Sequence, residues 1–135
     1  MSTTDAIDWS AGAAYIDGRF MPLAEARIPV TEWGYRRSDV TYDVTCVFFG
    51  AFFRLDDHIA RFRRSMDRMR MQPTESDAEI REILLELVRR TGLREAYVAM
   101  DCLRSRPPRG MPMLPVNARS YLVCFATPWV WLFSE

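Results

Sequence analysis

One stretch, from Trp33 to Met71, constrains the fold of this chain more than any other. Within it, residues 40–48 alternate between two sets of side chains with a period of two, which is typical of a strand with two unlike faces. Gly50 ends this strand and residues 52–55 resume as a second one, so residues 49–51 are expected to form the loop of an antiparallel hairpin.

The residues that follow have the pattern of an amphipathic helix. Asp56 is expected to be its N-cap, and the acidic Asp57 suits the first turn. Pro73 closes the segment. Apolar side chains recur at three- and four-residue steps and form one face: Ile59, Phe62, Met66 and Met69.

A second, polar stripe of this helix carries His58, Arg61, Ser65 and Arg68. A guanidinium forks onto phosphate or carboxylate with two parallel hydrogen bonds, and a helix N-terminus adds free N–H groups, so the stripe suits an anion. The alternative is a solvated outer face, which is the usual role of such residues. If the anion hypothesis holds, Arg61 should point into an open concavity beside His58 rather than onto a carboxylate.

Five segments together are similar to a known family: AYIDGRFMPLAEARIPVTEWGY, SDVTYDV, FFRLDDHIARF, the strand REAYVAM and the terminal PWVW. They resemble the N-terminal small domain of class IV (fold-type IV) pyridoxal-phosphate-dependent aminotransferases, with (R)-selective amine transaminases and branched-chain aminotransferase-like proteins as the most similar members. The similarity runs from about Ala14 to Trp131. It implies that Arg61 grips the cofactor phosphate.

The resemblance also implies a substrate pocket lined by Tyr42, Val44, Tyr97, Ala99, Arg37 and Arg109. From the residues alone, the four that lie on strands would be ordinary sheet packing. Arg37 stands where close relatives carry histidine, and Ala99 where they often carry an acidic residue. Arg109 resembles a mobile arginine that meets an oxo-acid carboxylate. These departures leave the substrate preference open.

All eighteen basic residues are arginine, and the chain contains no lysine. In the family, a larger C-terminal domain supplies the lysine that binds the cofactor as a Schiff base, which arginine cannot do. The resemblance therefore implies pyridoxal phosphate as cofactor but no covalent bond to this chain. We expect no catalytic residue here and no transaminase activity of the chain alone. The partners of an intact enzyme would be amines or amino acids, oxo acids and a second subunit.

The rest of the chain supplies a second hairpin, turned at Asp17-Gly18, and a second helix over about residues 77–91. Ser76 and Glu79 form a capping box at the start of that helix, and Gly92 ends it. A proline-rich loop separates the last two strands. The further strands are expected at residues 14–16, 19–21, 93–104 and 120–127.

These elements predict an α+β domain in which two helices cover a mostly antiparallel sheet of about five or six strands. The same architecture is implied by the resemblance, as the small domain of the D-amino acid aminotransferase-like fold. A chain of 135 residues with 49% hydrophobic content suffices for one compact domain. We expect residues 1–11 to be a flexible tail and residues 12–135 to be this small domain, with the large lysine-bearing domain absent.

Composition weighs against several other classes. Eighteen basic and eighteen acidic residues give zero formal net charge, so nothing favours nucleic acid or an acidic membrane as partner. Cys46, Cys102 and Cys124 lie in apolar runs and the chain has one histidine, which favours neither disulfides nor a metal site. Without a signal peptide or a membrane-spanning run, we expect a reduced, cytoplasmic protein.

Two other functions stay open. The chain could be a non-catalytic domain that associates with itself or a partner, because residues 128–133 are rich in tryptophan and phenylalanine and are expected, with Tyr42 and Tyr97, to be partly exposed. It could also be an arginine-rich nucleic-acid binder. The only support for that is the cluster Arg61, Arg63, Arg64, Arg68 and Arg70.

Overall fold

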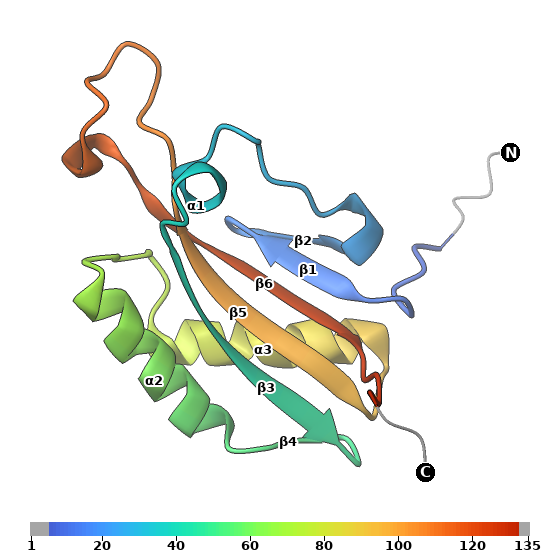
Figure 1. Cartoon of the computed structure of the whole chain (residues 1–135). Helices are drawn as coiled ribbons and strands as arrows, with labels where there is room; N and C mark the ends of the chain where they lie inside the picture. The colour runs from blue at the N-terminus through green and yellow to red at the C-terminus, as the bar shows by residue number, and fades with distance from the viewer. Residues whose placement is uncertain (1–5, 133–135) are drawn as a thin grey trace, which may run out of the picture.

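The computed structural model describes residues 6–132, which form a six-stranded antiparallel sheet covered by helices. The strand order is β2-β1-β6-β5-β3-β4. Helices α2 (Leu55–Arg68) and α3 (Asp77–Thr91) pack on one face of the sheet (Figure 1). The strands are β1 (Ala13–Ile16), β2 (Arg19–Pro22), β3 (Val40–Phe48), β4 (Ala51–Phe52), β5 (Ala96–Arg104) and β6 (Ser120–Pro128). The predicted α+β fold is confirmed.

The sheet has one covered and one open face. On β3, Thr45 and Val47 are buried beneath the helices, whereas Tyr42, on the opposite face, is 67% exposed. Strand β5 shows the same alternation, with Met100 fully buried and Tyr97 turned to the open face. The helices close the core with their apolar faces. On α2, Ile59, Phe62 and Met66 are buried as the sequence predicts, and Met69 is partly buried against the core. On α3 the buried residues are Ile80, Ile83, Leu84 and Leu87.

Both hairpins turn on two residues with left-handed backbone. Asp17 (φ 49°) and Gly18 (φ 91°) join β1 to β2, and Phe49 (φ 53°) and Gly50 (φ 78°) join β3 to β4. Paired positive φ values match the right-handed twist of the flanking strands. The predicted three-residue loop at 49–51 is therefore one residue too long, because Ala51 already pairs with Phe48.

The predicted start of α2 is wrong. We expected a second strand over residues 52–55 and an N-cap at Asp56, but β4 ends at Phe52 and the helix begins at Leu55. The residue before it, Arg54, takes a left-handed conformation (φ 50°, ψ 43°) and gives no side-chain cap. The chain turns there, so Asp56 becomes a first-turn residue that complements the positive helix end.

Helix α3 follows its sequence signals closely. The Ser76 side chain accepts the N–H of Glu79 at 3.2 Å, and the Glu79 carboxylate accepts the N–H of Ser76 at 2.7 Å. Gly92 follows the helix with φ 67°, a conformation that glycine adopts without strain. The predicted bounds, residues 77–91, agree with the observed ones.

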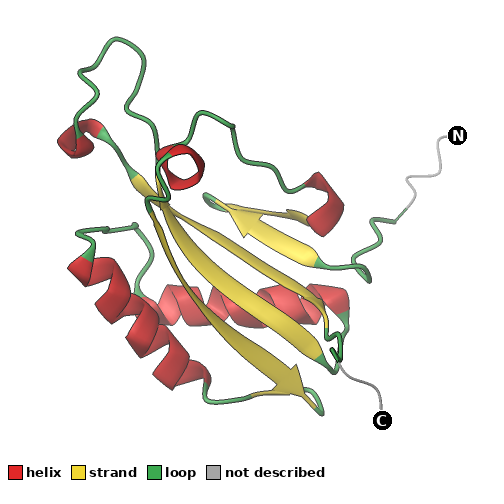
Figure 2. Cartoon of the chain, viewed as in Figure 1, coloured by secondary structure: helices red, strands yellow, loops and turns green. Residues whose placement is uncertain are grey.

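A short helix that the sequence did not indicate, α1 (Trp33–Arg36), lies on the open face at one end of the sheet. A Cβ atom on Gly34 would stand 2.7 Å from Cγ of Leu103, so only glycine lets α1 approach β5 this closely. The loops before α1 and between β5 and β6 gather at this same end (Figure 2). The two single-turn 3-10 helices are η1 (Leu23–Glu25) and η2 (Pro115–Asn117).

The ends of the chain are described only in part. The expected tail, residues 1–11, falls partly outside the described residues. Within its described part, Trp9 packs against the core, and the centre of the Trp9 ring lies 4.8 Å from the guanidinium carbon of Arg90. Across residues 6–132, no helix is both long enough and apolar enough to cross a membrane.

Candidate functional site

A charged cluster joins α2 to β3. The Asp43 carboxylate accepts hydrogen bonds from Nε of Arg61, at 2.6 Å, and from Nη2 of Arg61, at 2.9 Å. It also lies 2.8 Å from Nδ1 of His58. It also accepts the backbone N–H of Val44 at 2.9 Å. The Asp43 side chain is only 3% exposed, whereas that of Arg61 is 61% exposed. A buried carboxylate thus holds a largely exposed guanidinium in a forked pair.

This geometry corrects one expectation. Arg61 does lie beside His58, with 3.5 Å between Nη2 and Nδ1, but it has the carboxylate partner that we expected it to lack. The pairing arises because the polar stripe of α2 packs over the covered face of β3, where Asp43 points inward. An isolated carboxylate at that position would be costly to bury, and the guanidinium of Arg61 and the imidazole of His58 supply its hydrogen-bond partners.

The electrostatics of the cluster favour the ionised state of both partners. Burial alone would raise the pKa of Asp43, but hydrogen bonds from Arg61 and His58, with the charge of Arg61, outweigh it and hold that pKa below its ordinary value. The hydrogen bond and charge of Asp43 in turn raise the pKa of Arg61. Arg61 is therefore a fixed, permanently charged group.

The cluster leaves donors free for a further anion. The hydrogen bonds to Asp43 use Nε and Nη2 of Arg61, and Nη1 makes none within residues 6–132. Two N–H donors on a charged, exposed group match one face of a phosphate. The phosphate of pyridoxal phosphate, the cofactor that the resemblance implies, fits this donor set, and Arg61 is the residue that would hold it.

Four of the six predicted pocket residues lie together on the open face. Strand register places Val44 opposite Ala99. Tyr42 lies two residues before Val44 on β3, and Tyr97 lies two residues before Ala99 on β5, so both point to the same face as that pair. Opposite side chains on one face of an antiparallel pair stand about 5 Å apart, so the four form one continuous patch. Tyr97 is 36% exposed and Ala99 only 3%.

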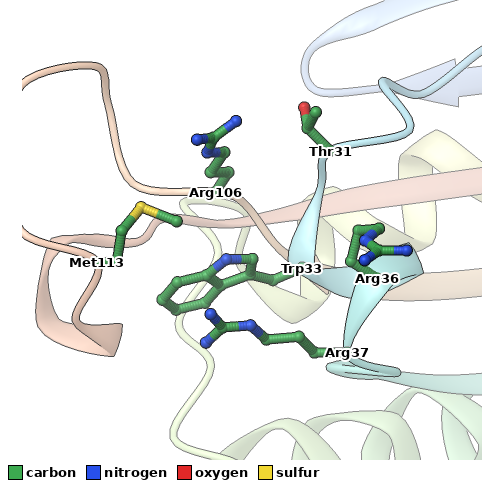
Figure 3. A pocket seen from close by; sticks show the side chains of 6 residues that line it. All are labelled: Thr31, Trp33, Arg36, Arg37, Arg106 and Met113. Atoms are coloured by element: carbon green, nitrogen blue, oxygen red, sulfur yellow. The ribbon is translucent and has the colours of Figure 1, made fainter.

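The other two predicted pocket residues line two separate pockets away from the strand patch. Arg37 lines a pocket of about 250 Å³, and its guanidinium carbon stands 4.1 Å from the centre of the Trp33 ring (Figure 3). Arg109 lines a neighbouring pocket of about 510 Å³ in the loop between β5 and β6. Arg106 and Met113 line both pockets. The two pockets therefore adjoin, and the lining of neither includes the four strand residues.

Two acidic residues were not among the predicted site residues. Asp43 belongs to the SDVTYDV segment, and its place on the same strand face as Thr45 and Val47 was the signal that it would be buried. Asp101 lies on the open face opposite Tyr42, and burial raises its pKa to about 6. Its only signal was a single acidic residue within the apolar run AYVAMDCL.

The apolar end of the chain packs partly on the sheet. Trp129 meets Phe48 with ring centres 5.0 Å apart, and Trp131 lies 5.8 Å from Trp129. Trp131 is nevertheless 67% exposed and Leu132 86%, as expected for this segment. The expectation for Phe133 lies outside the described residues. A groove of about 490 Å³ is lined by Tyr97, Thr127, Pro128, Trp129, Val130, Trp131 and Leu132.

Metal-ligating side chains are scattered over the described part of the chain. No three of the histidine, cysteine, aspartate and glutamate residues between positions 6 and 132 come together in a way that could hold a metal ion. All three cysteines are free thiols, of which Cys102 and Cys124 are buried and Cys46 is half-buried.

Comparisons with known proteins agree with the fold. A family model, Amino-transferase class IV, matches residues 41–131. D-alanine aminotransferase of Bacillus licheniformis is 31% identical over 93 residues, which are 69% of this chain and 33% of that protein. The crystal structure of a T.th. branched-chain amino acid aminotransferase complexed with 4-methylvaleric acid has a TM-score of 0.77 and 27% identity, over 89% of this chain and 41% of that one.

A more distant structure shows the same fold. The branched-chain amino acid aminotransferase of Escherichia coli superposes with a TM-score of 0.78 at 17% identity, over 88% of this chain and 41% of that one. The chain therefore spans between a third and about two fifths of the length of these relatives. Since the family match covers most of the chain and includes Asp43, His58 and Arg61, the chain belongs to the class IV aminotransferases.

Proposed function

We propose that this chain is the small domain of a pyridoxal-phosphate-dependent class IV aminotransferase and that Arg61 holds the cofactor phosphate. The observation that carries the proposal is the Asp43–Arg61 pair, which lies inside the family match and leaves Nη1 of Arg61 free of partners among residues 6–132. A fixed guanidinium binds phosphate more tightly than a flexible one, because less side-chain entropy is lost on binding.

The proposed roles of the other residues follow from where they lie. Asp43 positions Arg61 and keeps it from collapsing onto other acids. Tyr42, Val44, Tyr97 and Ala99 would shape the substrate pocket and exclude water, and Arg37 and Arg109 would meet substrate carboxylates. When bound, pyridoxal phosphate supplies the electron sink for moving an amino group. The substrates of such an enzyme would be an amine or amino acid and an oxo acid.

The proposal includes where and how the domain acts. An aminotransferase of this family needs a lysine amine for its cofactor, and this sequence has none, so we propose that the chain is inactive by itself. It would act together with a lysine-bearing large domain and as part of a homodimer. Free cysteines favour a reducing compartment, and we propose the cytoplasm.

Thermal unfolding with a non-reactive ligand tests the role of Arg61. Pyridoxamine 5′-phosphate carries the same phosphate but no aldehyde, so it cannot attach to the terminal amine. We expect it to raise the Tm of the parent chain, since a ligand that binds only the folded state stabilises it. Arg61→Ala should abolish most of that rise. Arg64→Ala, which removes an exposed arginine one turn along α2, is the matched control and should keep it.

Two results would count against the proposal. The first is an equal ligand-induced rise in the parent and in Arg61→Ala. The second is no rise in the Tm of the parent at high ligand concentration, when the parent and Arg64→Ala have both been shown to be folded without ligand.

A non-catalytic, self-associating domain is the second candidate, favoured by the exposure of Tyr42 and Trp131. The nucleic-acid alternative loses support, because carboxylates lower the net positive charge of its arginine cluster: Asp43 pairs with Arg61 and Asp77 pairs with Arg63.

A further inference from the structure

Residues 8–12, which precede β1, form a turn that lies against the domain. The Asp8 carboxylate accepts the N–H of Ser10 at 2.9 Å, and the carbonyl of Trp9 accepts the N–H of Gly12 at 3.0 Å. The side chain of Trp9 is partly buried against the hydrophobic core. We call residues 8–12 the N-terminal clasp.

The clasp meets helix α3 at Arg90, a residue of the last turn of that helix. The guanidinium carbon of Arg90 lies 4.8 Å from the centre of the Trp9 ring and 4.4 Å from the centre of the Phe20 ring, which belongs to β2. Aromatic rings attract a cation at such distances. Nε of Arg90 also donates to the Glu86 carboxylate, one turn earlier on α3, at 2.9 Å, and this bond helps to fix the guanidinium. One cation thus joins the clasp, β2 and α3.

Gly12 lets the clasp join β1 in this closed position. Its φ of 138° is a conformation that other residues rarely adopt, and a Cβ atom there would stand 2.7 Å from the carbonyl oxygen of Ala126 on β6. The carbonyl of Gly12 accepts the N–H of Leu23, the first residue of η1, at 3.1 Å. The clasp is therefore held by its backbone at Gly12 and by its side chain at Trp9.

The strand that the clasp reaches is an edge of the sheet. Within residues 6–132, β2 pairs with β1 alone. Edge strands present unpaired backbone groups that can pair with another chain, so contacts that hold them in place matter. On β2, Phe20 supplies such contacts, because its ring lies against Arg90 and 5.1 Å from the ring of Tyr15. The clasp covers this set of contacts from the other side of Arg90.

We propose that residues 8–12 are a strap that locks the edge of the sheet to the end of α3, and that the contact between Trp9 and Arg90 is its latch. The strap opens as a local unit while the rest of the sheet stays folded, because its opening breaks few contacts beyond those of Trp9 and Gly12. This inference goes beyond the proposed function, because it uses no residue that holds the cofactor or the substrate.

Hydrogen exchange of backbone amides, followed by NMR on the whole chain, tests the strap. The N–H groups of Gly12 and Leu23 report on it, because both hydrogen bonds break when it opens. Their protection factors should agree within about threefold, as expected for one opening unit. Trp9→Ala should speed both exchange rates about tenfold, the effect of removing a partly buried aromatic side chain. Arg90→Ala should speed both about fivefold, because the Trp9 ring loses its cation.

Matched variants separate the latch from general effects on stability. Arg89→Ala removes the neighbouring arginine, which also pairs with Glu86, and should leave both rates within about twofold of the parent. Trp131→Ala should do the same, because opening the strap breaks no contact of that ring, which meets Phe48 and Trp129. Trp9→Phe keeps a ring for Arg90 and should exchange more slowly than Trp9→Leu, which keeps only apolar area.

The double variant Trp9→Ala/Arg90→Ala decides whether the two side chains act through one contact. Its rates should lie within about twofold of those of Trp9→Ala alone, because the latch is already lost there. Fully multiplied effects in the double variant would overturn the proposal, as would equal rates in Arg89→Ala and Arg90→Ala. If Trp9→Ala does not fold, Trp9→Leu takes its place in the same comparison. These rates involve neither Arg61 nor a ligand, so the proposed function can fail without this one.

Discussion

Replacing Asp43 with asparagine tests whether the buried carboxylate holds the cluster together. The substitution keeps the shape but removes the charge that pairs with Arg61 and contacts His58. Hydrogen bonds to a charged group contribute about 1.5 to 3 kcal/mol, and a buried donor left unpaired costs more. Arg61 is 61% exposed and its donors can be solvated, so we expect a loss of about 2 kcal/mol in the free energy of unfolding at pH 7.

The loss should depend on pH in a definite direction. The pKa of Asp43 is lower in the folded chain than in the unfolded one, so the unfolded chain binds the extra proton as the pH falls. The contribution of Asp43 is therefore fully present above its unfolded pKa, about 3.9, and is lost as the pH falls through the lower, folded value. The difference between parent and variant should be constant from pH 7 to about 5 and should shrink below about 4.

Urea unfolding followed by tryptophan fluorescence, at pH 7 and at pH 3, measures both effects. Asp67→Asn is the control, because Asp67 is exposed on the same helix and makes no ion pair with the described residues; its effect should stay within about 0.5 kcal/mol. A loss below that level for Asp43→Asn, or a difference that persists unchanged at pH 3, would refute the reasoning.

Three further outcomes are expected. Asp101→Asn should stabilise the chain by about 1 to 3 kcal/mol at pH 7, because burial raises the pKa of Asp101 to about 6. The gain should vanish below about pH 4, where Asp101 is protonated in the folded and the unfolded chain alike, and an equal gain at pH 7 and below pH 4 in urea unfolding would contradict this. Incubation with pyridoxal phosphate and borohydride should give no adduct by mass spectrometry once the terminal amine is blocked, because the chain has no lysine; an internal adduct would disprove the expectation that no covalent bond to the cofactor forms. Sedimentation velocity should show self-association that weakens in Tyr42→Ser, since Tyr42 is 67% exposed; a concentration-independent monomer would exclude it.

Features set by neighbouring residues were predictable from the sequence. The Asp17-Gly18 turn forces paired left-handed residues, and the Ser76–Glu79 capping box satisfies its own backbone donors. Neither depends on what packs above it. The alternation on β3 likewise marked two unlike faces, and the burial of Val47 against the exposure of Tyr42 shows them.

Features that depend on docking were not predictable. The sequence indicated a polar stripe on α2 and an acidic position on β3, but only the packed structure brings Arg61 onto Asp43. The start of α2 shifted because Arg54 takes a left-handed conformation that no local rule favours for arginine. Asp101 gains its raised pKa from surrounding strands, which a single-residue signal does not convey.

A titration with pyridoxamine 5′-phosphate, read out at each arginine separately, tests most directly whether Arg61 holds the cofactor phosphate. With ¹⁵N-labelled chain and pyridoxamine 5′-phosphate, the Nε–H signal of Arg61 should shift saturably, and that shift should be much weaker in Asp43→Asn, in which the guanidinium is no longer held. An Arg61 signal that stays in place while those of other arginines move would contradict this role of Arg61.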